Sequence, residues 1–222
     1  MRFRLLVCAI ILGISAMIIG CAKFPAGSTP TTVREMSFTI EFNGPINDND
    51  WYFVPIDNTG GGLGPVPVFP GIVVGEGWVT GSATHYVQYH QRQYTVFRIT
   101  SLQPFLSEPI GSPVRSTIPD TGSKTLQFTI DLNAIAATGD SVDFNIITTD
   151  QPFASVRLLD GLGRTGTEFV NVDILTNRTI TNSEGISPET SGDVLDQNRN
   201  IQPSNDQTDP LDITDWSVTL NV

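Results

Sequence analysis

Two runs rich in acidic and amide side chains supply the oxygen atoms that a calcium ion requires. Residues 47–58 read NDNDWYFVPIDN, and residues 193–200 read DVLDQNRN. Calcium binds about six to eight oxygen atoms, and extracellular domains often hold it weakly. The ligands that these runs offer are Asp48, Asp50, Asp57, Asp193, Asp196 and Asn198. Neither run has the spacing of an EF-hand loop, so turn formation by Asn and Asp is the competing interpretation.

Aromatic side chains gathered in residues 51–94 form a second candidate surface. The rings singled out for ligand binding are Trp51, Trp78, Tyr86 and Tyr89. Flat rings with a polar edge suit contact with a sugar, but they also suit a core, and we expect most of them to be buried. Consecutive side chains in a strand point to opposite faces, so residues 51–53 must direct at least one ring outward or into another layer.

Motifs for catalysis are weak in this chain. Glu76 lies between glycines in VVGEGWVTG, but one carboxyl group is not a catalytic pair, and a hydrolase with two Asp or Glu residues in a loop cleft is kept as the alternative function. GLGRTG, at 161–166, has the spacing of a dinucleotide-binding loop but precedes another strand-like run rather than a helix. His85 and His90, the two histidines, fall on opposite faces of one strand. A non-catalytic protein is expected.

The N-terminus has the organisation of an export signal. Arg2 and Arg4 precede an uncharged apolar run over residues 5–19, which is shorter than the roughly 20 residues of a membrane-spanning helix. The sequence therefore predicts a signal peptide over residues 1–20.

The cysteine that follows this segment, Cys21, is a candidate site of lipid attachment. Residues 18–21, Ile-Ile-Gly-Cys, resemble the lipobox of bacterial lipoproteins. The resemblance implies cleavage before Cys21, attachment of diacylglycerol to its thiol and a membrane anchor of fatty chains. With Ala22 next, it implies the outer membrane in a Gram-negative cell envelope. A plain signal peptide and an uncleaved anchor are the competing interpretations.

Charge and cysteine content limit the remaining functions. The chain has 12 basic and 23 acidic residues, a net charge of −11, and removal of the two arginines of the signal leaves ten basic residues, or −13. An acidic domain repels nucleic acid and anionic lipid headgroups, so we expect neither as a partner. Because Cys8 is lost with the signal and Cys21 is acylated, the folded domain would contain no disulfide and no cysteine-bound metal.

Alternation of apolar and polar residues, typical of half-buried strands, dominates the rest of the chain. It is strongest in residues 36–42, 126–132, 142–146, 170–174 and 216–222. Other strand-like runs occupy residues 51–56, 72–74, 84–89, 94–100 and 156–159. Helical periodicity is nearly absent, although residues 131–140 could hold one or two helical turns.

These elements predict an all-β fold, an antiparallel β-sandwich of about ten strands with an immunoglobulin-like or jelly-roll-like arrangement. A flexible tether is expected over residues 21–33 and a single domain over residues 34–222. Long Gly/Pro-rich or Asp/Asn-rich loops are expected at 57–71, 101–124 and 182–215.

One segment of the domain resembles a known group of sandwiches. Residues 125–150, TLQFTIDLNAIAATGDSVDFNIITTD, are similar to a late segment of DOMON-like and related carbohydrate-binding modules. The resemblance implies a sandwich fold and assigns no binding residue. The whole sequence therefore predicts a lipid-anchored envelope or surface protein with a non-catalytic binding or structural role, for which a glycan and a partner protein are the candidate ligands and calcium is the candidate cofactor.

Overall fold

Alternating strands build two antiparallel sheets in the computed structural model, which describes residues 33–68, 77–151, 157–162, 168–184 and 210–222. Val33–Val222 clusters as one compact unit. The predicted signal peptide, the lipidation site at Cys21 and nearly all of the tether lie outside the described residues. In the part of the chain that is described, no helix has the length and apolar character needed to cross a bilayer.

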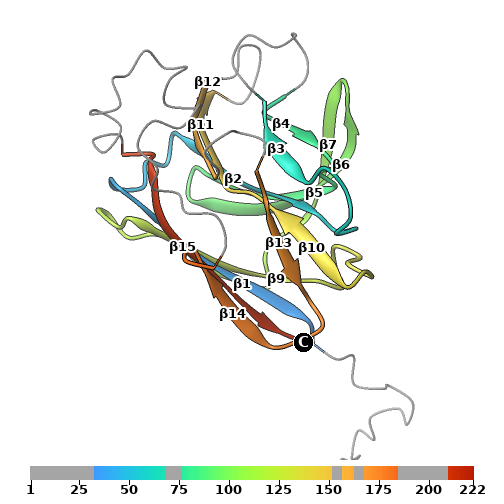
Figure 1. The fold of residues 1–222 in the computed structure, drawn as a ribbon. Helices are drawn as coiled ribbons and strands as arrows, with labels where there is room; N and C mark the ends of the chain where they lie inside the picture. Colours follow the sequence, from blue (N-terminus) through green and yellow to red (C-terminus); the bar gives the residue numbers. More distant parts are fainter. Residues whose placement is uncertain (1–32, 69–76, 152–156, 163–167, 185–209) are drawn as a thin grey trace, which may run out of the picture. The chain divides into compact units, whose positions relative to one another are not determined.

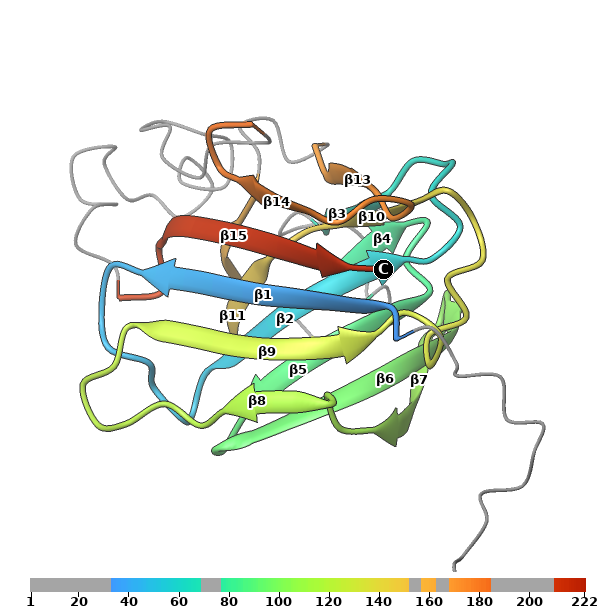
Figure 2. The ribbon, with the colours of Figure 1, turned by 90° about the horizontal axis from the view of Figure 1, so that it is seen from below.

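The first sheet has five strands and brings both ends of the domain together (Figure 2). Its order is β14 (Arg178–Thr181), β15 (Ile213–Asn221), β1 (Glu35–Phe42), β9 (Thr125–Asp131) and β8 (Arg115–Thr117). The central strand β1 pairs with the C-terminal strand β15 on one side and with β9 on the other. The strand predicted over residues 216–222 is confirmed as part of β15.

The second sheet has eight strands and faces the first (Figures 1 and 2). Its main path is β12 (Arg157–Gly161), β11 (Ile147–Gln151), β2 (Trp51–Asp57), β5 (His85–His90), β6 (Gln93–Leu102) and β7 (Phe105–Gly111). Strand β10 (Ser141–Phe144) pairs with the end of β2 and with β13 (Val170–Asp173). A separate small hairpin joins β3 (Pro65–Pro67) and β4 (Val79–Gly81).

The main core lies between the two sheets, where every second side chain of β1, β9 and β15 is buried. Phe38 stacks on Phe128 at 4.9 Å between ring centroids and meets Phe144 edge-on at 5.2 Å. The intervening residues of β1 face away from this core and are only partly buried or exposed. This pattern of one packed and one solvated face produces the alternation seen in the sequence.

The second sheet differs because β2 is buried on both faces. Phe53 belongs to a second apolar cluster on the side away from the main core, where it stacks on Trp78 at 3.9 Å. Tyr86 of β5 contacts the same two rings. The expectation that residues 51–53 direct a ring into another layer is confirmed.

The prediction of an all-β antiparallel sandwich is confirmed, with fifteen strands in the described residues rather than about ten. Two segments expected to be irregular contain strands, since β7 and β8 lie within 101–124 and β3 lies within 57–71. Their prolines are compatible with short or edge strands, which use only part of their backbone hydrogen-bonding capacity. Residues 132–136 form turns and no helix, and the strand expected at 72–74 is outside the described residues.

Candidate functional site

The segment from Phe105 to Ile118, which we call the edge segment, forms one open side of both sheets. Strand β7 ends the path of the eight-stranded sheet, and β8 ends the five-stranded sheet. The two strands follow one another in the chain, so the short link between them crosses from one sheet to the other (Figure 2).

Four large apolar side chains are exposed along the edge segment, at a spacing of four residues. They are Leu106, Ile110, Val114 and Ile118, with exposed fractions of 54%, 41%, 52% and 38%. A single exposed aliphatic residue is normal on a protein surface, but a group of them is typical of a surface that contacts another molecule. The edge segment is therefore the described surface best suited to binding.

The backbone of the edge segment is poorly suited to pairing with a strand from another molecule. Pro109, in the middle of β7, has no N–H group to donate, and β8 contains only three residues. The pairing of β6 with β7 is also irregular at two places. Prolines, short strands and bulges are common means of blocking an exposed sheet edge. Contact through side chains is therefore favoured over strand addition.

Polar contacts hold the edge segment against its neighbours. The Tyr86 and Ser107 hydroxyls lie 2.8 Å apart, and burial raises the pKa of Tyr86 to about 12, so the phenol stays protonated as a hydrogen-bonding group. Arg98 pairs with Glu108. The hydrogen bond and charge of Glu35 raise the pKa of Arg115. The apolar side chains are thus presented on a segment that is fixed from both sheets.

Of the predicted calcium ligands, the three that the structure describes do not lie together. Asp48 and Asp50 precede β2 and Asp57 ends it, so the seven residues of the strand separate them by roughly 20 Å. Asp193, Asp196 and Asn198 lie outside the described residues. Within the described ranges, no group of three or more His, Cys, Asp or Glu side chains is arranged to hold a metal ion. Asp48 and Asp50 therefore cannot share one ion with Asp57, and calcium binding by any of these residues stays a prediction.

Asp48 instead stabilises the turn before β2. The Tyr89 hydroxyl donates to Asp48 Oδ1 at 2.6 Å, and Arg92 Nη1 lies 3.5 Å from Asp48 Oδ2. Asn47 Nδ2 donates to Asp50 Oδ2 at 2.9 Å. Burial, followed by the bond to Asp48, raises the pKa of Tyr89. These contacts agree with the turn-forming interpretation of the run.

The four aromatic residues proposed for a sugar do not form an exposed platform. Trp78, Tyr86 and Tyr89 are buried, with their rings packed against other aromatic side chains. Trp51 is half-buried and stacks on His90 at 3.9 Å between centroids and 10° between planes. Trp78 and Tyr86 are buried in the cluster on the outer face of the second sheet, whereas Tyr89 is buried in the main core between the sheets.

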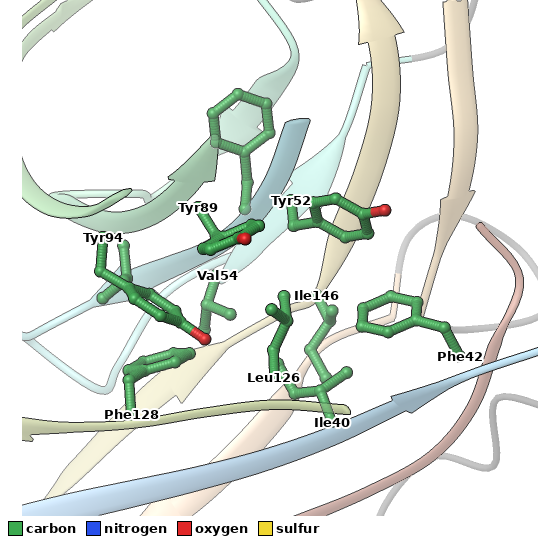
Figure 3. A pocket seen from close by; sticks show the side chains of 11 residues that line it. Ile40, Phe42, Tyr52, Val54, Tyr89, Tyr94, Leu126, Phe128 and Ile146 are labelled. Carbon is green, nitrogen blue, oxygen red and sulfur yellow. The ribbon is translucent and has the colours of Figure 1, made fainter. Parts of the chain in front are cut away.

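A cavity in the main core is too small for an organic ligand. Its volume is about 10 Å³. It lies among Tyr52, Tyr89, Tyr94, Phe42 and Phe128 (Figure 3). A cavity of this size holds at most about one water molecule, and an apolar lining gives that water few partners. The space is a packing defect between the two sheets.

One pair of acidic residues was missed by the sequence interpretation. Asp57 and Asp143 are opposite one another on the antiparallel strands β2 and β10. Both are buried. Asp143 lies in an ordinary alternating strand 86 residues further along the chain, so no local pattern marks it as a partner of Asp57.

Comparison with known proteins adds no family to these observations. No protein-family model, no curated protein and no solved structure matches the chain.

Proposed function

We propose that the chain is a lipid-anchored protein of the bacterial envelope that binds a partner protein through the edge segment and has no catalytic role. The exposure of Leu106, Ile110, Val114 and Ile118 on one ordered edge supports this proposal most directly. The lipobox resemblance at residues 18–21 supports the anchor.

Side-chain chemistry favours a protein over a glycan as the occupant of this surface. Sugar sites commonly use the flat faces of Trp or Tyr, and residues 105–118 contain neither. Aliphatic side chains with a few charged neighbours match the core and rim of protein interfaces.

Charge favours a different protein over a second copy of this chain. The net charge of −11 makes two copies repel one another at low salt. Pro109 and the short β8 also oppose the strand pairing that often joins identical sheet edges. The partner is therefore expected to present an apolar patch with a neutral or basic rim.

Photo-crosslinking in cells that naturally produce the protein tests the binding surface. A photoreactive amino acid replaces Leu106 or Val114 in one set of variants and the exposed Thr179 of β14 in the control. The expected result is one defined protein adduct from the edge positions and none from Thr179. A homodimer adduct, a glycan adduct or equal labelling at all three positions would contradict the proposal.

Binding of the identified partner then has to depend on the same side chains. The double variant Leu106→Ser/Val114→Ser should weaken binding of the purified partner at least about tenfold, because exposed aliphatic anchors are removed from the interface. Leu175→Ser is the matched control, since Leu175 is similarly exposed but lies after β13, outside the edge segment. Equal weakening in both variants would indicate non-specific adhesion.

Intact-mass analysis tests the anchor. The mature protein should begin at Cys21 and carry the mass of the attached lipid, and Cys21→Ser should abolish membrane association. A free thiol, or a chain that retains residues 1–20, would contradict the anchor without affecting the test of the edge segment.

A further inference from the structure

The acidic residues Asp57 and Asp143 face one another on the covered side of the eight-stranded sheet. Their neighbours in the register, Ile56 and Phe144, belong to the main core, so the two carboxylates project from the opposite face. Side chains at directly opposite positions of antiparallel strands have Cβ atoms about 5 Å apart. The exposed fractions of Asp57 and Asp143 are 0% and 1%.

The hydrogen bonds of Asp57 leave one oxygen without a partner. Asp57 Oδ1 accepts from the Thr59 backbone N–H at 3.0 Å and from the Thr59 hydroxyl at 2.7 Å. Asp57 Oδ2 is fully buried and has no hydrogen-bond donor. A buried carboxylate oxygen without a donor costs free energy, so this atom requires an explanation.

A third buried carboxylate shows what a purely structural acid does in this fold. Asp160 Oδ1 accepts from the Gly161 N–H at 2.7 Å, and Asp160 Oδ2 accepts from the Ile213 N–H at 2.7 Å. Both of its oxygens therefore have backbone donors, whereas Asp57 has donors on one side only.

Asp143 adds a second negative group to the same place without a basic neighbour. Its Oδ1 accepts from Asn171 Nδ2 at 2.5 Å. Among the described residues, the ion pairs involve other acids, namely Asp48, Glu108 and Glu35. Burial, and then the nearby charge of Asp57, raise the pKa of Asp143.

Gly62 and Ser82 pack near Asp57 Oδ2. A Cβ atom on Gly62 would lie 3.7 Å from Asp57 Oδ2 and 2.6 Å from Ser82 Oγ. The position that glycine leaves without a side chain is therefore within 4 Å of both a carboxylate oxygen and a hydroxyl oxygen. Asn171, at the margin of the pair, is exposed, so the position lies close to solvent.

We propose that Asp57 and Asp143 bind one divalent cation, calcium, which is coordinated by Asp57 Oδ2, the Asp143 carboxylate and water, with Ser82 Oγ beside it. The cation supplies the partner that Asp57 Oδ2 lacks and neutralises both buried charges, whereas one shared proton would leave a buried charge without a counter-ion. Two carboxylates and water make a weak site, with a dissociation constant on the order of 10⁻⁴ to 10⁻³ M.

Calcium titration of the chelator-treated, desalted full-length chain tests this site. Equilibrium dialysis with radioactive calcium should give one bound ion that is lost in Asp143→Asn and in Asp57→Asn. The thermal midpoint should rise with calcium in the wild type and stay unchanged in both variants. Asp143→Asn keeps the result interpretable if Asp57→Asn, which also disturbs the bonds from Thr59, does not fold.

Two controls separate this site from the other acids that the sequence analysis singled out. Asp48→Asn and the double variant Asp193→Asn/Asp196→Asn should both retain the bound calcium. Loss of calcium in either control, with retention in Asp143→Asn, would overturn the proposal. The absence of any calcium effect, together with stabilisation by acid that disappears in Asp143→Asn, would assign a shared proton to the pair and would also overturn it.

Discussion

Facing acidic residues occur on both sheets on the side away from the main core, but the pair Glu35 and Asp131 and the pair Asp57 and Asp143 have different surroundings. On the five-stranded sheet, Glu35 is opposite Asp131, and the exposed Arg115 binds the Glu35 carboxylate from β8. On the eight-stranded sheet, Asp57 is opposite Asp143, and both are buried without a described basic partner. The negative charge of the pair on the five-stranded sheet is thus balanced by an exposed arginine, whereas the pair on the eight-stranded sheet has neither a described basic partner nor exposure to solvent.

The cover on the second sheet causes this difference. The segment 58–64 packs on β10, where the Ser141 hydroxyl donates to the Gly60 carbonyl at 3.0 Å. Further along the same face, Trp78 closes over Phe53 and Tyr86. Among the described residues, no comparable layer covers the outer face of the five-stranded sheet over β1, where alternate residues are partly exposed. An acidic residue that would be solvated on an open sheet face is buried when that face is covered, and its charge then requires a counter-ion.

Removal of the aromatic cover should have the largest effect on stability. Trp78→Ala should lower the free energy of unfolding by about 3–5 kcal/mol, because a fully buried ring is replaced by a cavity. Thr39→Ala, on the open face of β1, should change it by less than about 0.5 kcal/mol. Urea denaturation of both variants gives the comparison. Similar small losses would mean that the second cluster is not a true core.

Displacement of the segment 58–64, which covers β10, should have the next largest effect on stability. Gly60 has a φ of +56°, and a Cβ atom there would lie 2.1 Å from the Ser141 carbonyl oxygen. Gly122 also has a positive φ, +85°, but has open space around it. Gly122→Ala should cost about 1–2 kcal/mol from backbone strain alone. Gly60→Ala should cost about 1–3 kcal/mol more because the loop must move off β10. Equal losses of stability for Gly60→Ala and Gly122→Ala, measured by urea denaturation, would show that the contact between Gly60 and Ser141 is not tight.

The sequence predicted the three central strands of the five-stranded sheet, β15, β1 and β9, because alternate side chains of each are buried, and it missed the outer strands β14 and β8. Residues 36–42 alternate cleanly, and β1 occupies Glu35–Phe42. The edge strand β7 was missed because Pro109 and Gly111 are poor strand formers, and a strand paired on one side only tolerates them.

The covered sheet was harder to interpret because its environment depends on distant residues. Residues 51–53 indicated that one ring faces outward or into another layer, but nothing local showed that Trp78 would cover it. Asp57 was singled out in the sequence for its oxygen atoms, yet its partner Asp143 is set by the pairing of β10 with β2. Register between strands far apart in the chain is not contained in local periodicity.

Acidification of the calcium-free protein should change the stability contributed by the buried pair Asp57 and Asp143, by less than the two substitutions above. Because the pKa of Asp143 is raised above 3.8, the folded state binds a proton more readily than the unfolded chain. Its contribution to the free energy of unfolding is therefore complete below pH 3.8 and is lost as the pH rises through the raised value. The wild type should gain stability relative to Asp143→Asn as the pH falls from 7 to 4.

Comparing these two proteins at each pH cancels the opposite contribution of His85. Burial and then Arg98 lower the pKa of His85, so its contribution is complete above pH 6.5 and declines as the pH falls. Urea denaturation at four pH values provides the measurement. A difference between wild type and Asp143→Asn that does not vary with pH would mean that the carboxylate is not buried in solution.

Loss of the arginine beside the pair Glu35 and Asp131 should have the smallest effect on stability, and this effect should depend on salt. Arg115→Ala removes the cation that binds Glu35, but Arg115 is exposed and water can solvate the carboxylate. The loss of stability should be smaller than that of Trp78→Ala or Gly60→Ala. It should also disappear near 0.5 M NaCl, where the screening length is only about 4 Å. A large loss that persists in salt would show that Arg115 acts through packing of β8 against β9. The two acidic pairs would then differ in how they are stabilised but not in how strongly the fold depends on that stabilisation.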